Sequence, residues 1–224
     1  MEEKKVVKIL MVDDHPSMLE GYKVILSYND FNYELETIAA HSCQTAFDII
    51  VNPLKKNYFD LAFLDYSLPS YDEMNIHNGE DLGILIKKYS PETKIVILTS
   101  HTEALLLYQI IQNVEPNGIL VKSDFSADEL ILAFGMIMVG DIYYSATVKQ
   151  ILKDMLLPEK YLSKQNRQLL TLIGDGVKTK NLPKILNLTL SAIQKRKTQI
   201  RIYLNLEKGT DEEIIKEAKK RGLV

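Results

Sequence analysis

The chain has few of the features that build covalent or membrane-bound scaffolds. Its 224 residues include one cysteine, Cys43, which excludes an internal disulfide framework and a zinc site built from cysteines. No apolar run approaches the roughly 20 residues that a membrane helix needs, and the opening residues MEEKKVVKIL lack the apolar stretch of a signal peptide. GxSxG, P-loop and GxGxxG motifs are absent, so hydrolase and nucleotide-binding functions lack support. We expect a cytoplasmic protein without a membrane partner.

The sequence does have enough apolar material for a core, and its charge is distributed unevenly. Hydrophobic residues make up 46% of the chain and charged residues 25%, as in ordinary globular proteins. Residues 1–159 carry 12 basic and 24 acidic residues, a formal charge of −12, whereas residues 160–224 carry 15 and 6, a charge of +9. This asymmetry favours two domains with different partners, and the basic one is a candidate for binding a polyanion. A solvated basic face is the plain alternative.

Short apolar runs alternate with helical patterns in the first part of the chain. The runs are continuously aliphatic, which indicates strands buried on both faces of a parallel sheet. The expected strands are residues 6–12, 35–39, 61–64, 95–98 and 119–121. The expected helices are residues 18–28, 43–54, 80–89, 103–114 and 127–139. The alternation predicts an α/β fold with a five-stranded doubly wound parallel sheet.

The remainder of the chain shows no strand-like pattern. A helical pattern covers residues 146–156, and residues 157–159 form an expected linker. From Ser163 onward the pattern is entirely helical. We therefore expect a first domain over residues 1–140, a terminal helix and linker over 141–160, and a smaller all-α domain over 161–224.

Polar residues follow the apolar runs at the end where open parallel sheets bind ligands. They are Asp13 and Asp14 after the first run, Asp65 after the third, Thr99 after the fourth and Lys122 after the fifth. Three acids at one edge repel one another unless a cation lies among them, and oxygen ligands suit Mg²⁺. A lysine and a hydroxyl complete an anion site. The set suits phosphoryl transfer onto a carboxylate, although each Asp alone is equally compatible with an ordinary turn.

The segments around these positions resemble a known family. ILMVDDH (9–15), LDYSLP (64–69), ILTS (97–100) and LVK (120–122) are similar to the receiver domain of two-component response regulators. The resemblance implies that Asp65 is the phosphoacceptor, Thr99 the switch hydroxyl and Lys122 the phosphate-binding lysine. The implied Mg²⁺ ligands are Asp13, Asp14, Asp65 and the backbone carbonyl of Ser67. The implied donor is a histidine kinase or a small acyl phosphate.

Two features depart from the family pattern. Residues 70–78 are inserted between Pro69 and the GEDL segment that opens the third helix. We interpret the insertion as a tolerated surface loop in preference to a partner-specific lid, so deleting residues 72–76 should leave folding nearly intact. Ile119 stands where the family has its switch aromatic, so the usual coupling of the threonine to an aromatic rotamer lacks its ring.

The all-α region carries clear helix boundaries. Ser163 can cap a first helix that ends near Gly176, and a short second helix covers residues 182–186 with Pro183 in its first turn. Thr189 can cap a third helix over residues 190–204. Thr210 and Glu213 form a capping box for a fourth helix over 211–221. Along the third helix, Ile193, Ile200 and Leu204 share the inward face.

Polar residues occupy the outward face of the third helix, as in a helix-turn-helix that enters the major groove of DNA. The segment resembles the LuxR/NarL-type helix-turn-helix in its Leu162–Ser163 pair, its LNLT turn (186–189) and its AKKRGL end (218–223). The GDIYYS segment (140–145) is also typical of that subfamily. The expected DNA-contacting residues are Ser191, Gln194, Lys195, Lys197, Thr198, Arg201, Lys178 and Lys180.

The sequence therefore predicts a LuxR/NarL-type response regulator, a phosphoacceptor rather than a turnover enzyme. Phosphorylation of Asp65 should promote a homodimer and sequence-specific binding to double-stranded DNA. One alternative is a DNA-binding regulator that works without phosphorylation, which the intact acidic site argues against. The other is an aspartate-based phosphatase, which would need a second acid where the chain has Ser67.

Overall fold

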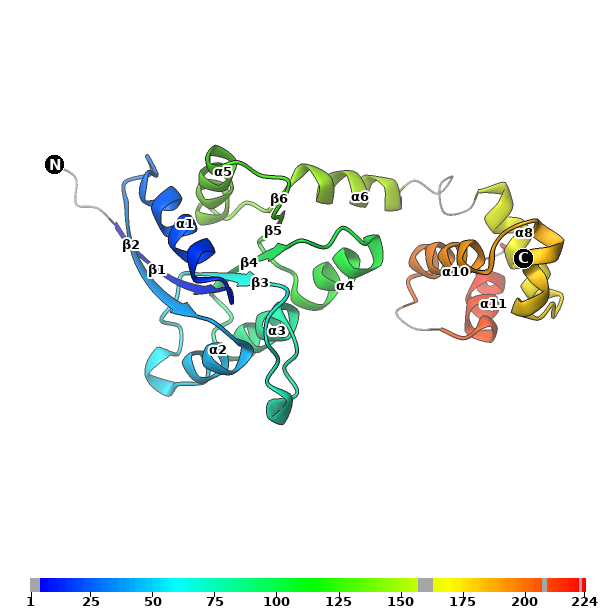
Figure 1. Cartoon of the computed structure of the whole chain (residues 1–224), viewed down its shortest axis with the longest axis horizontal. Helices are drawn as coiled ribbons and strands as arrows, with labels where there is room; N and C mark the ends of the chain where they lie inside the picture. The colour runs from blue at the N-terminus through cyan, green and yellow to red at the C-terminus, as the bar shows by residue number, and fades with distance from the viewer. Residues whose placement is uncertain (1–4, 157–162, 207–208, 222) are drawn as a thin grey trace. The chain divides into compact units, whose positions relative to one another are not determined.

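The computed structural model describes residues 5–156, 163–206, 209–221 and 223–224. The chain divides into two compact units, Met1–Lys149 and Gln150–Val224 (Figure 1). The linker expected over residues 157–159 lies outside the described residues. No helix within the described ranges has both the length and the apolar character that a membrane span requires.

The first unit is built on one sheet whose strands all run parallel. Its strands, in spatial order, are β2 (Tyr33–Ala40), β1 (Lys5–Val12), β3 (Leu61–Asp65), β4 (Lys94–Thr99), β5 (Gly118–Val121) and β6 (Tyr143–Tyr144). All five expected strands are present. The short β6, which pairs with Gly118 and Ile119, is an addition to the expected sheet.

Helices cover both faces of this sheet (Figure 1). They are α1 (Pro16–Ser27), α2 (Cys43–Ile50), α3 (Gly79–Tyr89), α4 (Ala104–Val114) and α5 (Ala127–Met138). α1 and α5 pack side by side on one face, and α2, α3 and α4 lie on the other. Between the sheet and the α1–α5 layer lies the main core, which includes Ile9, Phe63, Leu98 and Phe134.

Helix α2 is shorter than the sequence pattern indicated. It ends at Ile50 rather than at Leu54, and Pro53–Lys55 form a separate 3-10 turn. The apolar periodicity continues to Leu54, but the helix stops earlier because a proline disfavours a helical conformation in the residue before it. The helix begins at the buried Cys43, whose N–H donates to the carbonyl of Pro69. Burial raises the pKa of the Cys43 thiol to about 11.

The inserted segment is an anchored hairpin. The backbones of Tyr71 and Ile76 form two hydrogen bonds with each other, of 2.7 and 3.2 Å, and a 3-10 turn, Asp72–Met74, lies between them. Ile76 is 5% exposed, and the Tyr71 ring packs edge-on against Phe47 of α2, 5.6 Å between centroids. Deleting residues 72–76 would remove a buried side chain and the hairpin's own pairing, so the structure favours a cost in stability over the nearly neutral deletion expected from the sequence.

The second unit is helical throughout its described part. Its helices are the continuation of α6 (Ala146–Leu156), α8 (Lys164–Gly174), α9 (Leu182–Leu186), α10 (Leu190–Leu204) and α11 (Asp211–Lys220). Ser163, Thr189 and Thr210 cap their helices as expected, and Thr210 forms the expected capping box with Glu213. The core residues are Leu169, Leu170, Ile173, Leu182, Ile193, Ile200, Leu204, Ile214 and Ala218.

Candidate phosphoryl site and helix-turn-helix surface

Strand register brings the predicted site residues to one edge of the sheet. Val12 lies opposite Leu64, so Asp13 and Asp65 leave neighbouring strands at the same level. Thr99 is the last residue of β4 and lies opposite Val121, directly before Lys122. Because all these strands are parallel, their carboxyl ends lie at the same edge of the sheet.

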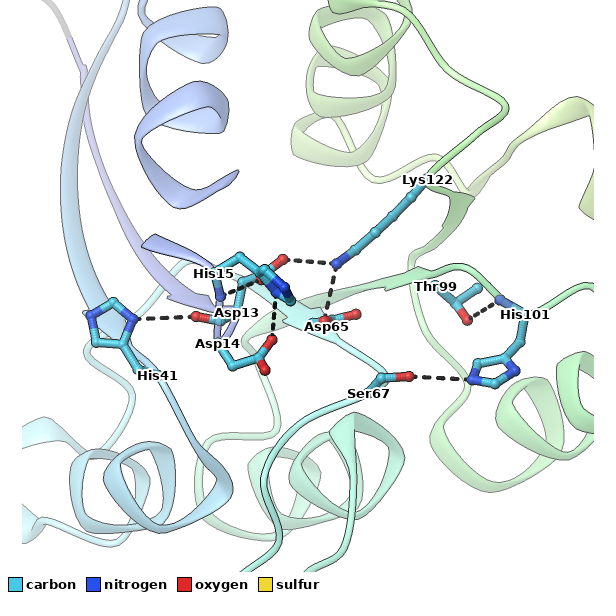
Figure 2. Close-up of polar contacts among 9 residues, drawn as sticks. All are labelled: Asp13, Asp14, His15, His41, Asp65, Ser67, Thr99, His101 and Lys122. Carbon is cyan, nitrogen blue, oxygen red and sulfur yellow. Dashed lines mark hydrogen bonds and ion pairs between the residues drawn. The ribbon is translucent and has the colours of Figure 1, made fainter. Parts of the chain in front are cut away.

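Lys122 joins two of the acidic residues. Its Nζ lies 2.9 Å from Asp13 Oδ2 and 3.0 Å from Asp65 Oδ2 (Figure 2). The side chains of Asp13 and Asp65 are 1% and 5% exposed, whereas that of Asp14 is 33% exposed. The two buried carboxylates thus share one ammonium, and the third stands at the mouth of the site.

The charges of this cluster shift one another's protonation. Burial raises the pKa of Asp65, and the nearby charge of Asp13 adds to the rise, while the hydrogen bond from Lys122 opposes it. Burial by itself would lower the pKa of Lys122, but hydrogen bonds to Asp13 and Asp65 outweigh it and the pKa is raised. Lys122 therefore stays charged, and Asp65 is an aspartate whose negative charge is costly unless a cation faces it.

The donor set at this edge fits a divalent metal ion. Single ligand atoms of Asp13, Asp14 and His15 lie within 4.8 Å of one another. Asp65 adds another buried carboxylate, so the carboxylates together exceed the charge that Lys122 supplies. Hard oxygen ligands with excess negative charge are what Mg²⁺ prefers. The residues present thus match the chemistry of a magnesium site.

Thr99 and Ser67 lie on the side of Asp65 away from Asp13 (Figure 2). Thr99 is fully buried, and its Oγ1 accepts the N–H of His101 at 3.0 Å. The Ser67 hydroxyl is 3.2 Å from His101 Nε2, and the rings of Tyr66 and His101 meet edge to face at 5.3 Å. His101 therefore links the chain after β3 to the chain after β4.

Histidines to which no role was assigned from the sequence line the site. His15 Nδ1 lies 2.8 Å from Asp14 Oδ1 and its N–H donates to Asp13 Oδ1. His41 Nδ1 lies 3.3 Å from the backbone carbonyl of Asp13. The available signal was proximity in sequence: His15 directly follows the two acids, and His101 lies two residues after Thr99. His41 follows β2, and strand pairing brings it there.

Gly79 is a further site residue that sequence reasoning treated as a helix start. A Cβ at this position would lie 2.1 Å from the backbone oxygen of Asp65. The N–H of Gly79 donates to the carbonyl of Tyr66. The first residue of α3 thus fixes the backbone of the expected phosphoacceptor, and only a residue without a side chain fits there.

The second unit exposes some of the expected DNA-contacting residues. Exposed positions are Ser191, Gln194 and Lys195 on α10, and Lys178 and Lys180 at the 3-10 turn Thr179–Asn181. Thr198 and Arg201 are half-buried and hydrogen-bonded to each other at 3.1 Å. The exposed members therefore gather on the N-terminal half of α10 and on the turn before α9.

Lys197 is placed differently from the other expected contacts. Its side chain is 14% exposed and forms an ion pair with Asp211. Its Nζ also lies 3.2 Å from Thr179 Oγ1. A phosphate contact from Lys197 would have to replace this ion pair.

A polar network inside the second unit also escaped the sequence analysis. Asn166 is fully buried, and its Oδ1 accepts Arg196 Nη1 at 3.0 Å. Its amide donates to Gln199 Oε1 at 3.3 Å. Arg196 also donates to Gln165. The network ties α8 to the middle of α10.

Buried aspartates bridged by a lysine at the carboxyl edge of a doubly wound parallel sheet are the arrangement expected of a receiver domain. Residues 9–134 match the response regulator receiver domain. That match covers more than half of the chain, and the chain belongs to the response regulators. The region around Asp13, Asp65 and Lys122 lies within the matched range.

Known proteins resemble the chain along nearly its whole length. The oxygen regulatory protein NreC of Staphylococcus epidermidis is 26% identical over 97% of this chain and 99% of its own. NreC of Staphylococcus carnosus is 24% identical over the same shares. A structure of the RcsB response regulator of Salmonella typhimurium aligns with a TM-score of 0.62 at 19% identity, covering 96% of this chain and 99% of that one. Another, of two RcsB dimers bound to two parallel DNAs, aligns with a TM-score of 0.61 at 21% identity over 96% and 98%.

Proposed function

We propose that a histidine kinase or a small acyl phosphate phosphorylates Asp65, and that this controls sequence-specific binding to double-stranded DNA by the second unit. The observation that carries the proposal is the Lys122 bridge between Asp13 and Asp65 at the carboxyl edge of the sheet. We assign the receiver function to residues 1–140, the connection to 141–160 and DNA binding to 161–224. In this role the chain is a phosphoacceptor and not a turnover enzyme.

The residues of the site divide the work. The Asp65 carboxylate attacks the phosphorus of the donor. The bond between phosphorus and the donor's histidine nitrogen or acyl oxygen breaks, and the leaving group keeps the electrons of that bond. The Lys122 ammonium and the Thr99 hydroxyl donate hydrogen bonds to oxygens of the phosphoryl group. Lys122 is thereby drawn away from Asp13. Mg²⁺, held by Asp13, Asp14, Asp65 and the Ser67 carbonyl, would supply positive charge against the transferred oxygens. Asp13 and Asp65 are buried before the reaction, so little reorganisation is needed.

The second unit supports DNA binding through its charge and its exposed side chains. Residues 160–224 carry a formal charge of +9. Gln194 and Lys195 lie exposed on α10, where a Gln can pair with adenine and a Lys with guanine. The related RcsB structure contains DNA. We assign Ser191, Thr198, Lys178, Lys180, Lys197 and Arg201 to the DNA backbone.

A second copy of the chain is the expected partner of the phosphorylated state. The neighbouring helices α1 and α5 carry exposed apolar side chains, with Val24 55% and Leu132 52% exposed. Apolar side chains exposed on adjacent helices are a common feature of protein interfaces. The related RcsB forms dimers on DNA. Light scattering before and after phosphorylation tests this step, and a persistent monomer contradicts it.

The test of the phosphoacceptor is chemical. Incubation with acetyl phosphate and Mg²⁺ should add one hydroxylamine-labile phosphoryl group to the chain, seen by intact mass, and Asp65→Asn should abolish it. Label that persists on the Asn variant would remove Asp65 from the mechanism. Asp14→Ala should weaken Mg²⁺ binding because one hard ligand is lost. Unchanged metal affinity would show that the metal lies elsewhere.

The test of DNA recognition is binding-site selection with and without phosphorylation. Gln194→Ala should cost about 1–3 kcal/mol at the selected site and relax the sequence preference there. Lys178→Ala, the comparison variant, should weaken all sequences about equally and lower the salt dependence. The reverse pattern would show that α10 does not read the bases. Equal binding with and without phosphorylation would favour a regulator that works without the phosphoryl group.

A further inference from the structure

The segment around Lys122 is held from outside the matched receiver range. The match ends at residue 134, yet two residues that follow it hydrogen-bond the chain on both sides of Lys122. The N–H of Val121 donates to Ser145 Oγ at 3.2 Å. The N–H of Thr147 donates to Asp124 Oδ2 at 2.7 Å. Residues 121–124 and the start of α6 therefore form one hydrogen-bonded unit.

The first of these contacts is buried, and the second is part-buried and strengthened by charge. Ser145 is fully buried, so the N–H of Val121 would lose its partner without the serine hydroxyl. Asp124 caps the first turn of α6, and its short contact to Thr147 is a charge-assisted hydrogen bond. Burial would raise the pKa of Asp124, but the hydrogen bonds from Ser145 and Thr147 outweigh it and lower the pKa. These hydrogen bonds thus favour the ionised form of the Asp124 carboxyl group.

Strand β6 fixes the same segment from its other side. Ser145 N–H donates to the carbonyl of Ile119 at 3.0 Å, and Tyr144 pairs with Ile119. Ile119 is fully buried and stands where the family has its switch aromatic. Ile119 therefore provides no aromatic ring that could change rotamer with the state of the site. Instead, strand β6 pairs with this edge of the sheet, and its backbone leads directly into α6 (Figure 1).

We propose that Ser145 and Asp124 are positioning residues for Lys122, and that through them the phosphoryl site is coupled to α6. This helix runs past Lys149, where the first unit ends, and carries the chain into the second. The N–H of Lys122 also donates to the Thr99 carbonyl. Thr99 is thus bonded to Lys122, and residues on either side of Lys122 in the chain are bonded to Ser145 and to Thr147 at the start of α6. The inference rests on the proposed phosphorylation of Asp65 and deepens it.

The coupling has a direction. When Lys122 moves toward a phosphoryl group on Asp65, residues 121–124 are drawn toward the site and the bonds to Ser145 and Thr147 weaken. Coupling between two sites is reciprocal, so weakening those bonds by substitution must also alter the phosphoryl site. The first effect is seen at α6 and the second at Asp65.

Hydrogen exchange on the full-length chain tests the first effect. Phosphorylation by acetyl phosphate with Mg²⁺ should speed exchange of the amides of residues 145–149 at least about threefold, a small part of what losing a charged hydrogen bond allows. Asp65→Asn should show no change under the same treatment. If Asp65 is phosphorylated and these amides do not respond, the coupling is refuted while the phosphoacceptor assignment stands. If the wild-type chain takes no phosphoryl group, both are refuted.

The lifetime of the phosphoryl group on Asp65 tests the reciprocal effect. Asp124→Ala should change that lifetime at least about threefold, because Lys122 is held less firmly. Asp124→Asn keeps an oxygen that can accept the Thr147 N–H and should restore most of the lifetime. Asp141→Ala, an exposed acid in the loop before β6, is the matched control and should leave the lifetime unchanged. A lifetime that stays constant in Asp124→Ala would show that the contact only stabilises α6.

Discussion

The two units place the polar residues of their candidate sites in opposite ways. In the first, Asp13 and Asp65 are almost completely buried and held by Lys122. In the second, Gln194, Lys195 and other polar side chains of α10 are exposed around a small core. Chemistry at one carboxylate needs a preorganised pocket, whereas binding a polyanion needs several accessible cations. A single substitution should therefore have a large effect in the first unit and a small one on the proposed DNA-binding surface.

The largest effect should come from a residue of the first unit that has no side chain. Gly79→Ala places a Cβ 2.1 Å from the Asp65 carbonyl oxygen, so the backbone of Asp65 or the start of α3 has to move. A misplacement of about 1 Å can cost about a hundredfold in rate, and we expect a loss of that order in phosphorylation by acetyl phosphate. Gly21→Ala is the control, because its Cβ meets nothing within 4 Å. Equal rates in both variants would contradict the tight fit of α3 against Asp65.

The next effect tests the small core of the second unit. Ile200→Ala removes a fully buried side chain of α10 and should cost about 2–5 kcal/mol of unfolding free energy. Hydrogen exchange resolved by segment should then show α8 to α11 opening while the sheet of the first unit stays protected. Ile185→Ala, at an exposed position of α9, should change little. Loss of protection in both units together would mean that they fold as one.

The network around Asn166 should give a smaller effect on the same unit. Asn166→Ala leaves Arg196 and Gln199 without a buried partner, at a cost of about 1–3 kcal/mol. Urea unfolding followed by segment-resolved exchange measures it. Gln168→Ala, at an exposed position of the same helix, is the control. If the two variants are equally stable, Asn166 contributes no net stability to the packing of α8 on α10.

The smallest effect is a pH dependence at the surface of the second unit. The hydrogen bond from Arg221 lowers the pKa of Glu217 below its usual value of 4.5. The stability from this pair is therefore present above about pH 4.5 and lost as the pH falls through the lowered pKa. Glu217→Gln should destabilise the unit slightly at pH 6 and not at pH 3. Equal stability of the variant and the wild-type chain at pH 6 would contradict this contribution of the Glu217–Arg221 pair.

The first unit was the easier one to predict from sequence, and its register explains why. Continuous apolar runs marked the five longer strands, and parallel strands place their last residues at one edge, so Asp13, Asp65 and Lys122 were brought together by topology alone. The two-residue β6 was too short to show a pattern. The roles of Gly79 and His101 depend on contacts between loops, which spacing along the chain does not encode.

In the second unit, capping residues and periodicity predicted the helices. They did not predict which basic side chains are exposed and which are paired. Lys197 and Lys195 lie two residues apart on one helix, and composition treats them alike. One is paired with Asp211 from α11 and the other is exposed. The partner comes from a helix further along the chain, so only tertiary packing separates the two lysines.

The buried thiol at the start of α2 can serve as a probe of how often the first unit opens. Cys43 is the single cysteine of the chain, it is fully buried, and its pKa of about 11 leaves almost no thiolate at neutral pH. Reagents that modify thiols should reach Cys43 only when the first unit opens. The labelling rate therefore measures the frequency of those openings and does not depend on the opening of the second unit. An exposed cysteine introduced into the second unit could then be labelled selectively in the otherwise native chain.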